Sequence, residues 1–172
     1  MGRRCFAGVS MQITEMSAKE CRELLARKGG GRLACARDNQ PYIVPIYFVA
    51  EGDNLFCFST LGQKIEWMRA NPLVCIQADD IRSQFDWKSV VVFGRYEELL
   101  DDEKHEQARR HAITLFSRRD NWWVGAYAAD EVRKHGGDPT PVIFIVHITQ
   151  ISGIRAEPDA AQVALDVAQQ KW

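Results

Sequence analysis

The feature that most constrains this fold is a series of short apolar segments that return after short polar turns. Five of them are predicted to be strands: Arg32–Arg37, Tyr42–Ala50, Leu55–Ser59, Leu73–Ala78 and Ser89–Leu99. Turn-forming residues separate most of these segments, as at Asp38-Asn39-Gln40-Pro41 and Glu51-Gly52-Asp53-Asn54. Strands so closely spaced pair with antiparallel neighbours, because a parallel pair needs a long crossover connection. The sequence therefore predicts a mainly β protein built on an antiparallel sheet or barrel.

Helices are predicted to flank this sheet. Ser17-Ala18-Lys19-Glu20 has the form of a capping box, in which the serine hydroxyl and the glutamate carboxylate each bind a free backbone amide. The helix that it opens ends at Gly29-Gly30-Gly31. Further helices are predicted over Gln63–Ala70, after a cap at Asp101, and over Val124–His135.

The last strand of the series is a long apolar run. It covers Val142–Thr149, and Ile151–Ala156 continues it beyond an expected kink at Gly153. No repeat or linker divides the 172 residues, a length typical of one domain. We expect an N-terminal extension over residues 1–16, a barrel domain over 17–157 and a weakly helical tail over 158–172.

The charge balance excludes several classes of partner. Lys and Arg number 22 and Asp and Glu number 23, so the formal net charge is −1. Such a chain has no global electrostatic attraction for nucleic acid or for an acidic membrane. Its apolar runs are shorter than a bilayer span, and its start has no apolar core of signal-peptide length. We therefore expect a soluble, cytoplasmic protein.

Cysteine and histidine spacing argues against a metal site. No C-x-x-C pair is present, and three of the five cysteines lie in apolar runs, where reduced cysteine acts as a small core residue. His105 and His111 are six residues apart on a predicted helix, about 240° around its axis, so they cannot share one ion. Neither a nucleophile elbow nor a Walker loop occurs, so the motifs give no support for nucleophilic hydrolysis or nucleotide-triphosphate chemistry.

The segment from Ser59 to Lys64 is the best candidate for chemistry. A strand ends there, two hydroxyls and a glycine follow, and a helix opens with Lys64 in its first turn. Free amides at a helix N-terminus attract an anion, and hydroxyl and ammonium groups add donors at the same place. The pattern is compatible with a phosphate site, and the other interpretation is an ordinary serine or threonine cap beside a solvated lysine.

Two further features have more than one interpretation. Pro45 lies inside the second strand, and because proline has no N–H for a sheet ladder, its nitrogen must face an edge, a bulge or a ligand. Trp87, Trp122 and Trp123 lie near polar or turn-like sequence. These indoles are suited to line a pocket for a flat ligand, to form a subunit interface or to cap the end of a small barrel.

Taken together, these residues resemble the pyridoxamine-phosphate-oxidase-like superfamily of FMN-binding split barrels. The most similar branch holds small flavin-nucleotide-binding proteins related to nitroimidazole-resistance reductases. The resemblance extends from about Ser17 to Leu99, with Val142–Arg155 similar to the closing strands. It is carried by Gly31-Arg32-Leu33-Ala34, Gln40–Phe48, Ser59–Lys64, Met68-Arg69-Ala70-Asn71-Pro72 and Trp87-Lys88-Ser89-Val90-Val91.

The resemblance implies a six-stranded antiparallel split β-barrel that forms a homodimer, with two FMN molecules bound between the subunits. FAD is the alternative cofactor, because it shares the same phosphate. By position, the phosphate would be held by Ser59, Thr60, Gln63 and Lys64, and the ring edge by the backbone of Pro45, Ile46 and Tyr47. Trp87 and Ser89 would be further pocket residues, and Trp122 and Trp123 would be walls from the partner subunit.

The chemistry implied is hydride transfer from a nicotinamide donor to a small acceptor by way of the flavin, so the resemblance implies no catalytic side chain. Two positions depart from the resemblance. Phe58 stands where a histidine is common in the nitroimidazole-resistance branch, and Ile154-Arg155-Ala156-Glu157-Pro158 lacks the R-x-H motif of true pyridoxamine phosphate oxidases. We therefore do not expect vitamin B6 oxidation. The alternatives are a non-catalytic flavin carrier or sensor, and a barrel that binds haem or deazaflavin.

Overall fold

The computed structural model describes residues 11–118 and 141–158. Its strands are β1 (Met11–Glu15), β2 (Gly30–Arg37), β3 (Gln40–Glu51), β4 (Asn54–Thr60), β5 (Leu73–Ile81), β6 (Trp87–Glu98) and β7 (Pro141–Pro158). Three helices accompany them in this part of the chain: α1 (Ala18–Lys28), α2 (Gln63–Ala70) and α3 (Glu106–Ser117). None of these helices is long and apolar enough to cross a membrane.

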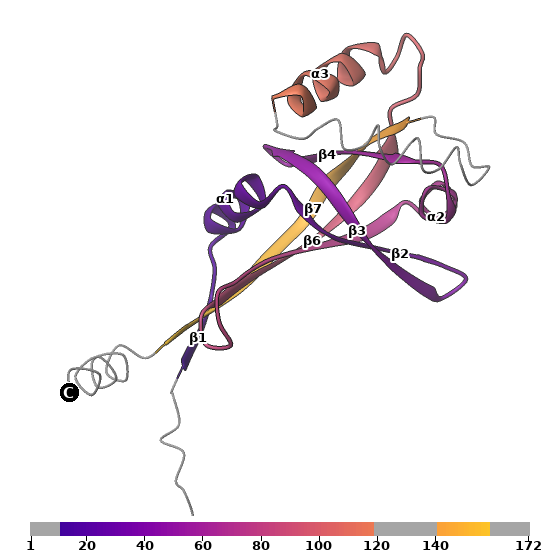
Figure 1. Cartoon of the computed structure of the whole chain (residues 1–172). Coiled ribbons are helices and arrows are strands. Elements are labelled where there is room, and N and C mark those ends of the chain that lie inside the picture. The colour runs from indigo at the N-terminus through magenta and orange to yellow at the C-terminus, as the bar shows by residue number, and fades with distance from the viewer. Residues whose placement is uncertain (1–10, 119–140, 159–172) are drawn as a thin grey trace, which may run out of the picture.

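The strands form a closed antiparallel ring (Figure 1). The order is β7-β4-β3-β2-β5-β6, and pairing of β6 with β7 closes the ring through six strands. The long β7 makes closure possible, because its first half pairs with β4 and most of its length pairs with β6. β1 extends the sheet by pairing with the end of β7. The predicted six-stranded antiparallel barrel is confirmed.

Alternation of side chains along the strands places the core inside the ring. Leu33, Ile76, Val90 and Val92 point inward and are fully buried, as expected where every second residue of a strand faces one side. A second, smaller core lies outside the ring, where α3 covers the outer side of β4 and β7. It is formed by Phe56, Leu99, Ala112, Leu115, Phe116, Ile143 and Ile145.

Local sequence signals determine most of the turns. Asp38 and Asn39 have φ angles of 52° and 62°, the left-handed pair of a type I′ hairpin between β2 and β3. The predicted capping box is present in α1, since the Ser17 hydroxyl and the Glu20 carboxylate bind each other's backbone amide. Gly29 ends α1 in the left-handed conformation, with a φ angle of 63°.

Two details differ from the sequence expectations. α3 begins at Glu106 rather than directly after Asp101, because the Asp102 carboxylate accepts from the backbone amide of His105 and holds residues 101–105 in a turn. β7 passes Gly153 without a break. The irregularity lies instead between Phe93 and Gly94, where β6 and β7 shift register. The predicted helix over 124–135 lies outside the described residues.

Candidate functional site

The barrel is split where β3 stops pairing with β4. The backbone N–H of Phe48 donates to the carbonyl of Gly29, over 3.0 Å, so Phe48 faces β2. Because hydrogen-bonding groups alternate along an antiparallel strand, Ile46 also faces β2, while Pro45 and Tyr47 direct their backbone groups to the other side. On that side β4 pairs with β3 only from Phe48 onward. The nitrogen of Pro45 therefore faces a sheet edge, one of the three environments predicted for it.

The strand that would continue the pairing turns away. β4 stays paired with β7 as far as Thr60, while its pairing with β3 stops at Cys57. By the same alternation, the backbone groups of Phe58 and Thr60 point back toward β3. We call the gap between these two edges the β3–β4 opening, bounded by Pro45 and Tyr47 on one side and by Phe58 and Thr60 on the other.

The segment Ser59–Lys64 connects this opening to α2. The N-cap of α2 is Gly62, and no side chain caps the helix. The Ser59 hydroxyl donates to the carbonyl of Thr60 over 3.2 Å instead. The interpretation of Ser59 or Thr60 as an ordinary helix cap is therefore wrong. The first backbone amides of α2 have no capping partner from a side chain, as an anion site requires.

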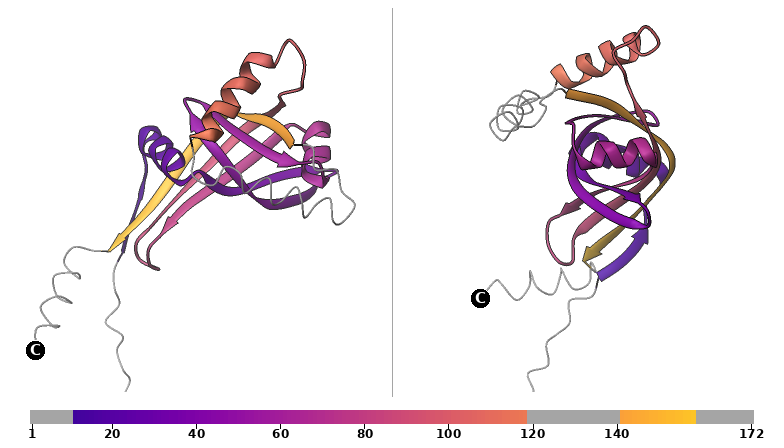
Figure 2. Two further views of the ribbon diagram at one scale, coloured as in Figure 1. Left: turned by 45° about the horizontal axis from the view of Figure 1, so that its top comes forward. Right: turned by 90° about the vertical axis from the view of Figure 1, so that its right-hand side faces the viewer.

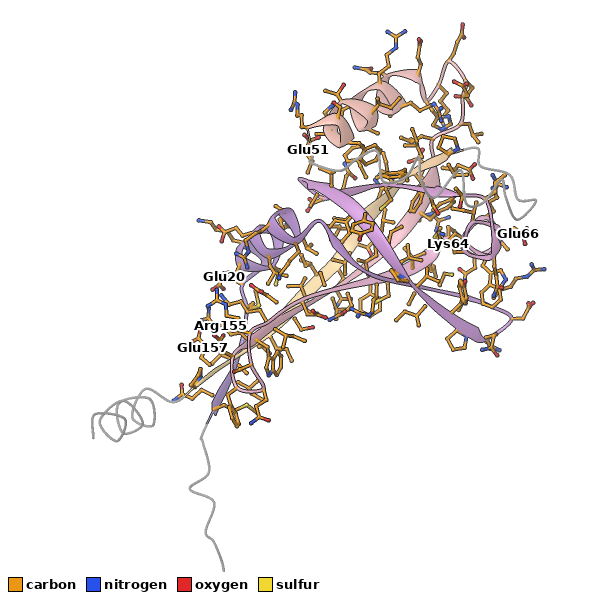
Figure 3. The ribbon with its side chains drawn as sticks, in the orientation of Figure 1. Glu20, Glu51, Lys64, Glu66, Arg155 and Glu157 are labelled. Atoms are coloured by element: carbon orange, nitrogen blue, oxygen red, sulfur yellow. The ribbon has the colours of Figure 1, made fainter. Side chains whose placement is uncertain are left out.

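Lys64 is half-buried at the start of α2, on the helix that lies across one end of the ring of strands (Figures 2 and 3). Burial lowers the pKa of its ammonium group, and the nearby Cys35 thiol raises that pKa to a smaller extent. Within residues 11–118 and 141–158, no carboxylate lies within ion-pair distance of Lys64. A partly desolvated cation without a counter-ion is costly, and an anionic ligand would offset that cost.

A bidentate ion pair holds α2 against β6. Arg69 donates through Nε and one terminal nitrogen to the two oxygens of Glu98, each over 2.7 Å. The Tyr96 hydroxyl adds a third hydrogen bond to Glu98 over 2.8 Å. Hydrogen bonds from Arg69, opposed by burial and helped by Tyr96, hold the pKa of Glu98 below its usual value. This cluster fixes the helix that carries Lys64, and nothing in the sequence pattern singled it out.

Trp87 and Ser89 line a different hollow, on the outer side of the hairpin between β5 and β6. The hollow has a volume of about 320 Å³, and its lining is Gln77, Asp79, Ile81, Ser83, Gln84, Trp87, Lys88 and Ser89. We call it the β5–β6 cleft. It begins at Gln77, midway along β5, whereas α2 precedes Leu73, the first residue of that strand, and these two positions are roughly 14 Å apart at about 3.4 Å per residue. One copy of the chain therefore holds the two groups of predicted site residues apart (Figure 1).

Other predicted site residues are placed as follows. The Ile46 side chain is buried in the barrel, and Tyr47 is the most exposed large apolar residue of the described chain, at 73%. Trp122 and Trp123 lie outside the described residues. Within the described ranges, no group of histidine, cysteine and carboxylate side chains is arranged to hold a metal ion.

The two positions that depart from the resemblance have structural partners. Phe58 contacts Phe116 of α3 edge to face, with ring centroids 5.2 Å apart. Arg155 donates to Glu20 over 2.7 Å and to the Thr14 hydroxyl over 3.1 Å, where β7 meets α1 (Figure 3). Both side chains therefore contribute to packing or anchoring at these positions.

Comparison with known proteins agrees with this geometry. A family model described as pyridoxamine 5'-phosphate oxidase matches residues 17–155. The chain belongs to this family. A curated member, an uncharacterized protein of Rhizobium meliloti (strain 1021), is 41% identical over 143 residues, covering 83% of this chain and 95% of the relative. The family predicted from the resemblance is confirmed.

Two solved structures are similar over most of the chain. An FAD-binding protein from Mesorhizobium loti is 42% identical, with a TM-score of 0.69, and the match covers 86% of this chain and 99% of that protein. The FAD binding protein from Mycobacterium smegmatis is 26% identical, with a TM-score of 0.57, over 83% of this chain and 98% of its own. Both of these similar structures are therefore of proteins described as FAD-binding.

The ion pair that anchors α2 predicts a pH-dependent stability. Because the folded-state pKa of Glu98 is lowered, its contribution is complete above the unfolded-state pKa of about 4.3 and is lost as the pH falls through the folded-state value. We expect Glu98→Gln to lower the free energy of unfolding at pH 7 by about 1–2 kcal/mol. Denaturant unfolding at pH 7 and at stepwise lower pH should show this difference disappearing.

Glu66→Gln is the matched control, on the same helix. Glu66 is exposed, and none of the described cations lies within ion-pair distance of it. This variant should leave the free energy of unfolding unchanged at both ends of the pH range. A Glu98→Gln difference that persisted in acid would show that the carboxylate charge is not what anchors α2.

Proposed function

We propose that this chain binds a flavin nucleotide at the β3–β4 opening, with the phosphate on Ser59–Lys64. The observation that carries the proposal is Lys64, a half-buried ammonium group for which the described chain supplies no carboxylate. A phosphate there would receive a charge-assisted hydrogen bond from Lys64 and further bonds from the uncapped amides of α2.

The rest of the opening fits the ring of a flavin. Tyr47 and Pro45 present backbone groups that no described strand pairs with on that side. Such groups can bind polar atoms of a planar heterocycle, in the way that they would otherwise bind a neighbouring strand. Both the donor set for phosphate and the edge for the ring are therefore supplied by residues adjacent in the fold, although they are distant in sequence.

The choice between FMN and FAD depends on more than the phosphate turn. Both molecules carry a phosphate next to the ribityl chain, so Lys64 serves either. The Mesorhizobium loti protein, 42% identical, is an FAD-binding protein. We therefore propose FAD, as well as FMN, as a candidate cofactor of this chain.

The activity that follows is that of a flavin-dependent oxidoreductase. Bound flavin would supply hydride transfer between a nicotinamide and a small acceptor. The protein's part is to bind, to orient and to exclude water, and no side chain need act as nucleophile or base. Anaerobic addition of NADH or NADPH should bleach the flavin absorbance. A flavin that stayed oxidised would leave a carrier or sensor as the function.

Loss of Lys64 should weaken flavin binding specifically. We expect purified protein to retain the yellow absorbance of flavin after FMN or FAD is added and the excess removed. Lys64→Ala should weaken affinity by about 1.5–3 kcal/mol, the usual worth of a charge-assisted hydrogen bond. Fluorescence titration measures this loss, with Lys19→Ala as control because Lys19 is 87% exposed on α1. Unchanged flavin affinity in Lys64→Ala would show that the phosphate does not bind at this turn.

We also propose that the active form is a homodimer. The outer face of β3, β2, β5 and β6 carries a continuous apolar row, in which Ile43, Ala34, Cys75 and Phe93 are successive cross-strand partners. Exposed apolar side chains on this face are Ile43 (62%), Tyr47 (73%), Leu73 (63%), Ile81 (68%) and Phe93 (48%). A contiguous patch of this kind is typical of a subunit interface. Within one chain, the β5–β6 cleft and the β3–β4 opening are held apart. In a homodimer, the cleft of one copy would lie at the opening of the other.

A charge in the apolar row should separate the subunits. We expect Phe93→Asp to be monomeric by light scattering and to bind flavin more than tenfold more weakly, because burying an unpaired carboxylate is costly. Ile113→Asp is the matched control, since Ile113 is equally exposed at 48% but lies on α3. A monomeric wild-type protein, or a monomeric Phe93→Asp variant with undiminished flavin affinity, would contradict a site shared between subunits.

A further inference from the structure

The β5–β6 cleft contains a glutamine whose orientation is fixed by its neighbours. Nε2 of Gln77 donates to Oδ2 of Asp79 over 3.0 Å and to Oγ of Ser89 over 3.1 Å. A carboxylate has no hydrogen to donate, so the amide atom that faces Asp79 must be the nitrogen. Arg32 lies 3.8 Å from the same Asp79 oxygen and helps to hold that carboxylate in place.

This arrangement leaves one acceptor and one donor unused. Both N–H groups of Gln77 are engaged, so its carbonyl oxygen is available only to accept. The Ser89 oxygen accepts from Gln77, so its own O–H is available to donate. Among the described residues, neither group has another hydrogen-bond partner. Gln77 and Ser89 lie on neighbouring strands and line the same cleft.

An acceptor beside a donor is complementary to an N–H beside a carbonyl, as in a lactam or an imide. The cleft walls suit a flat molecule, because Trp87 and Ile81 line them with apolar surface. A volume of about 320 Å³ lies within the range of ligand pockets. The pyrimidine part of the flavin ring has this chemistry, with N3–H between two carbonyls.

We infer that Gln77 and Ser89 recognise the imide edge of the flavin ring, with Gln77 accepting from N3–H and Ser89 donating to an adjacent carbonyl. The inference rests on the proposed flavin-binding function and on the proposed homodimer, in which the cleft of one copy meets the β3–β4 opening of the other. It adds the group that selects the ring. Asp79 is then a positioning residue, since it determines which end of the Gln77 amide faces the ligand.

Methylation of N3 tests the contact directly. FMN and FAD, each in native and N3-methylated form, would be titrated against the wild-type protein with flavin fluorescence as the readout. We expect the methyl group to weaken wild-type binding about tenfold, because it removes the donor and leaves the Gln77 oxygen unpaired. In Gln77→Ala, native flavin should bind about tenfold more weakly, with no further loss on methylation.

Two variants complete the design. Gln84→Ala alters the same cleft but not the described hydrogen-bonded pair, so it should keep the tenfold preference for native flavin. Ser89→Ala should weaken both forms several-fold and keep their ratio. Equal wild-type binding of native and methylated flavin would overturn this inference alone. Failure of the wild-type protein to bind either native flavin would overturn the proposed function with it.

Discussion

The arrangement of the candidate site depends on the point at which β3 and β4 stop pairing. From Tyr47 toward Gln40, β3 pairs with β2 alone among the described strands, and Pro45 has no N–H with which to continue the ladder on the other side. The barrel tolerates this loss because β4 remains bonded to β7 over its whole length. An opening with exposed backbone groups is therefore a consequence of the fold, and proline at position 45 costs no hydrogen bond there.

To bind a phosphate, that opening would also need a positive charge beside it. α2 follows β4 after two residues and carries Lys64 in its first turn, while Arg69 in its last turn binds Glu98 of β6. This short helix thus places Lys64 near the opening, while Arg69 anchors the helix on the opposite side of the ring. Because helices of this length have little stability of their own, the tertiary contacts of α2 determine where Lys64 stands.

The sequence predicts much of this architecture for identifiable reasons. Hairpin turns, the capping box and alternating apolar residues are local signals, and each is present where predicted. The Arg69–Glu98 pair and the Gln77–Ser89 bond join residues 29 and 12 positions apart, and no local pattern specifies such contacts. The residue pattern indicated the turn at Lys64 as a candidate anion site, and family resemblance supplied the pocket position of Ser89. The resemblance did not supply Gln77, because the role proposed for that residue depends on the hydrogen bonds that fix the orientation of its amide, and these are visible only in the structure.

The two parts of the site would hold a flavin by different physical means. A phosphate keeps its charge whatever the redox state of the ring, so the ammonium group of Lys64 and the amides of α2 give an anchor whose strength does not change during a reaction. The ring changes its charge and protonation when it is reduced, and in the proposed site it would face the neutral acceptor and the neutral donor of the β5–β6 cleft. Strong binding and tolerance of both redox states are then compatible, because the strongest interaction acts on the part of the ligand that does not react.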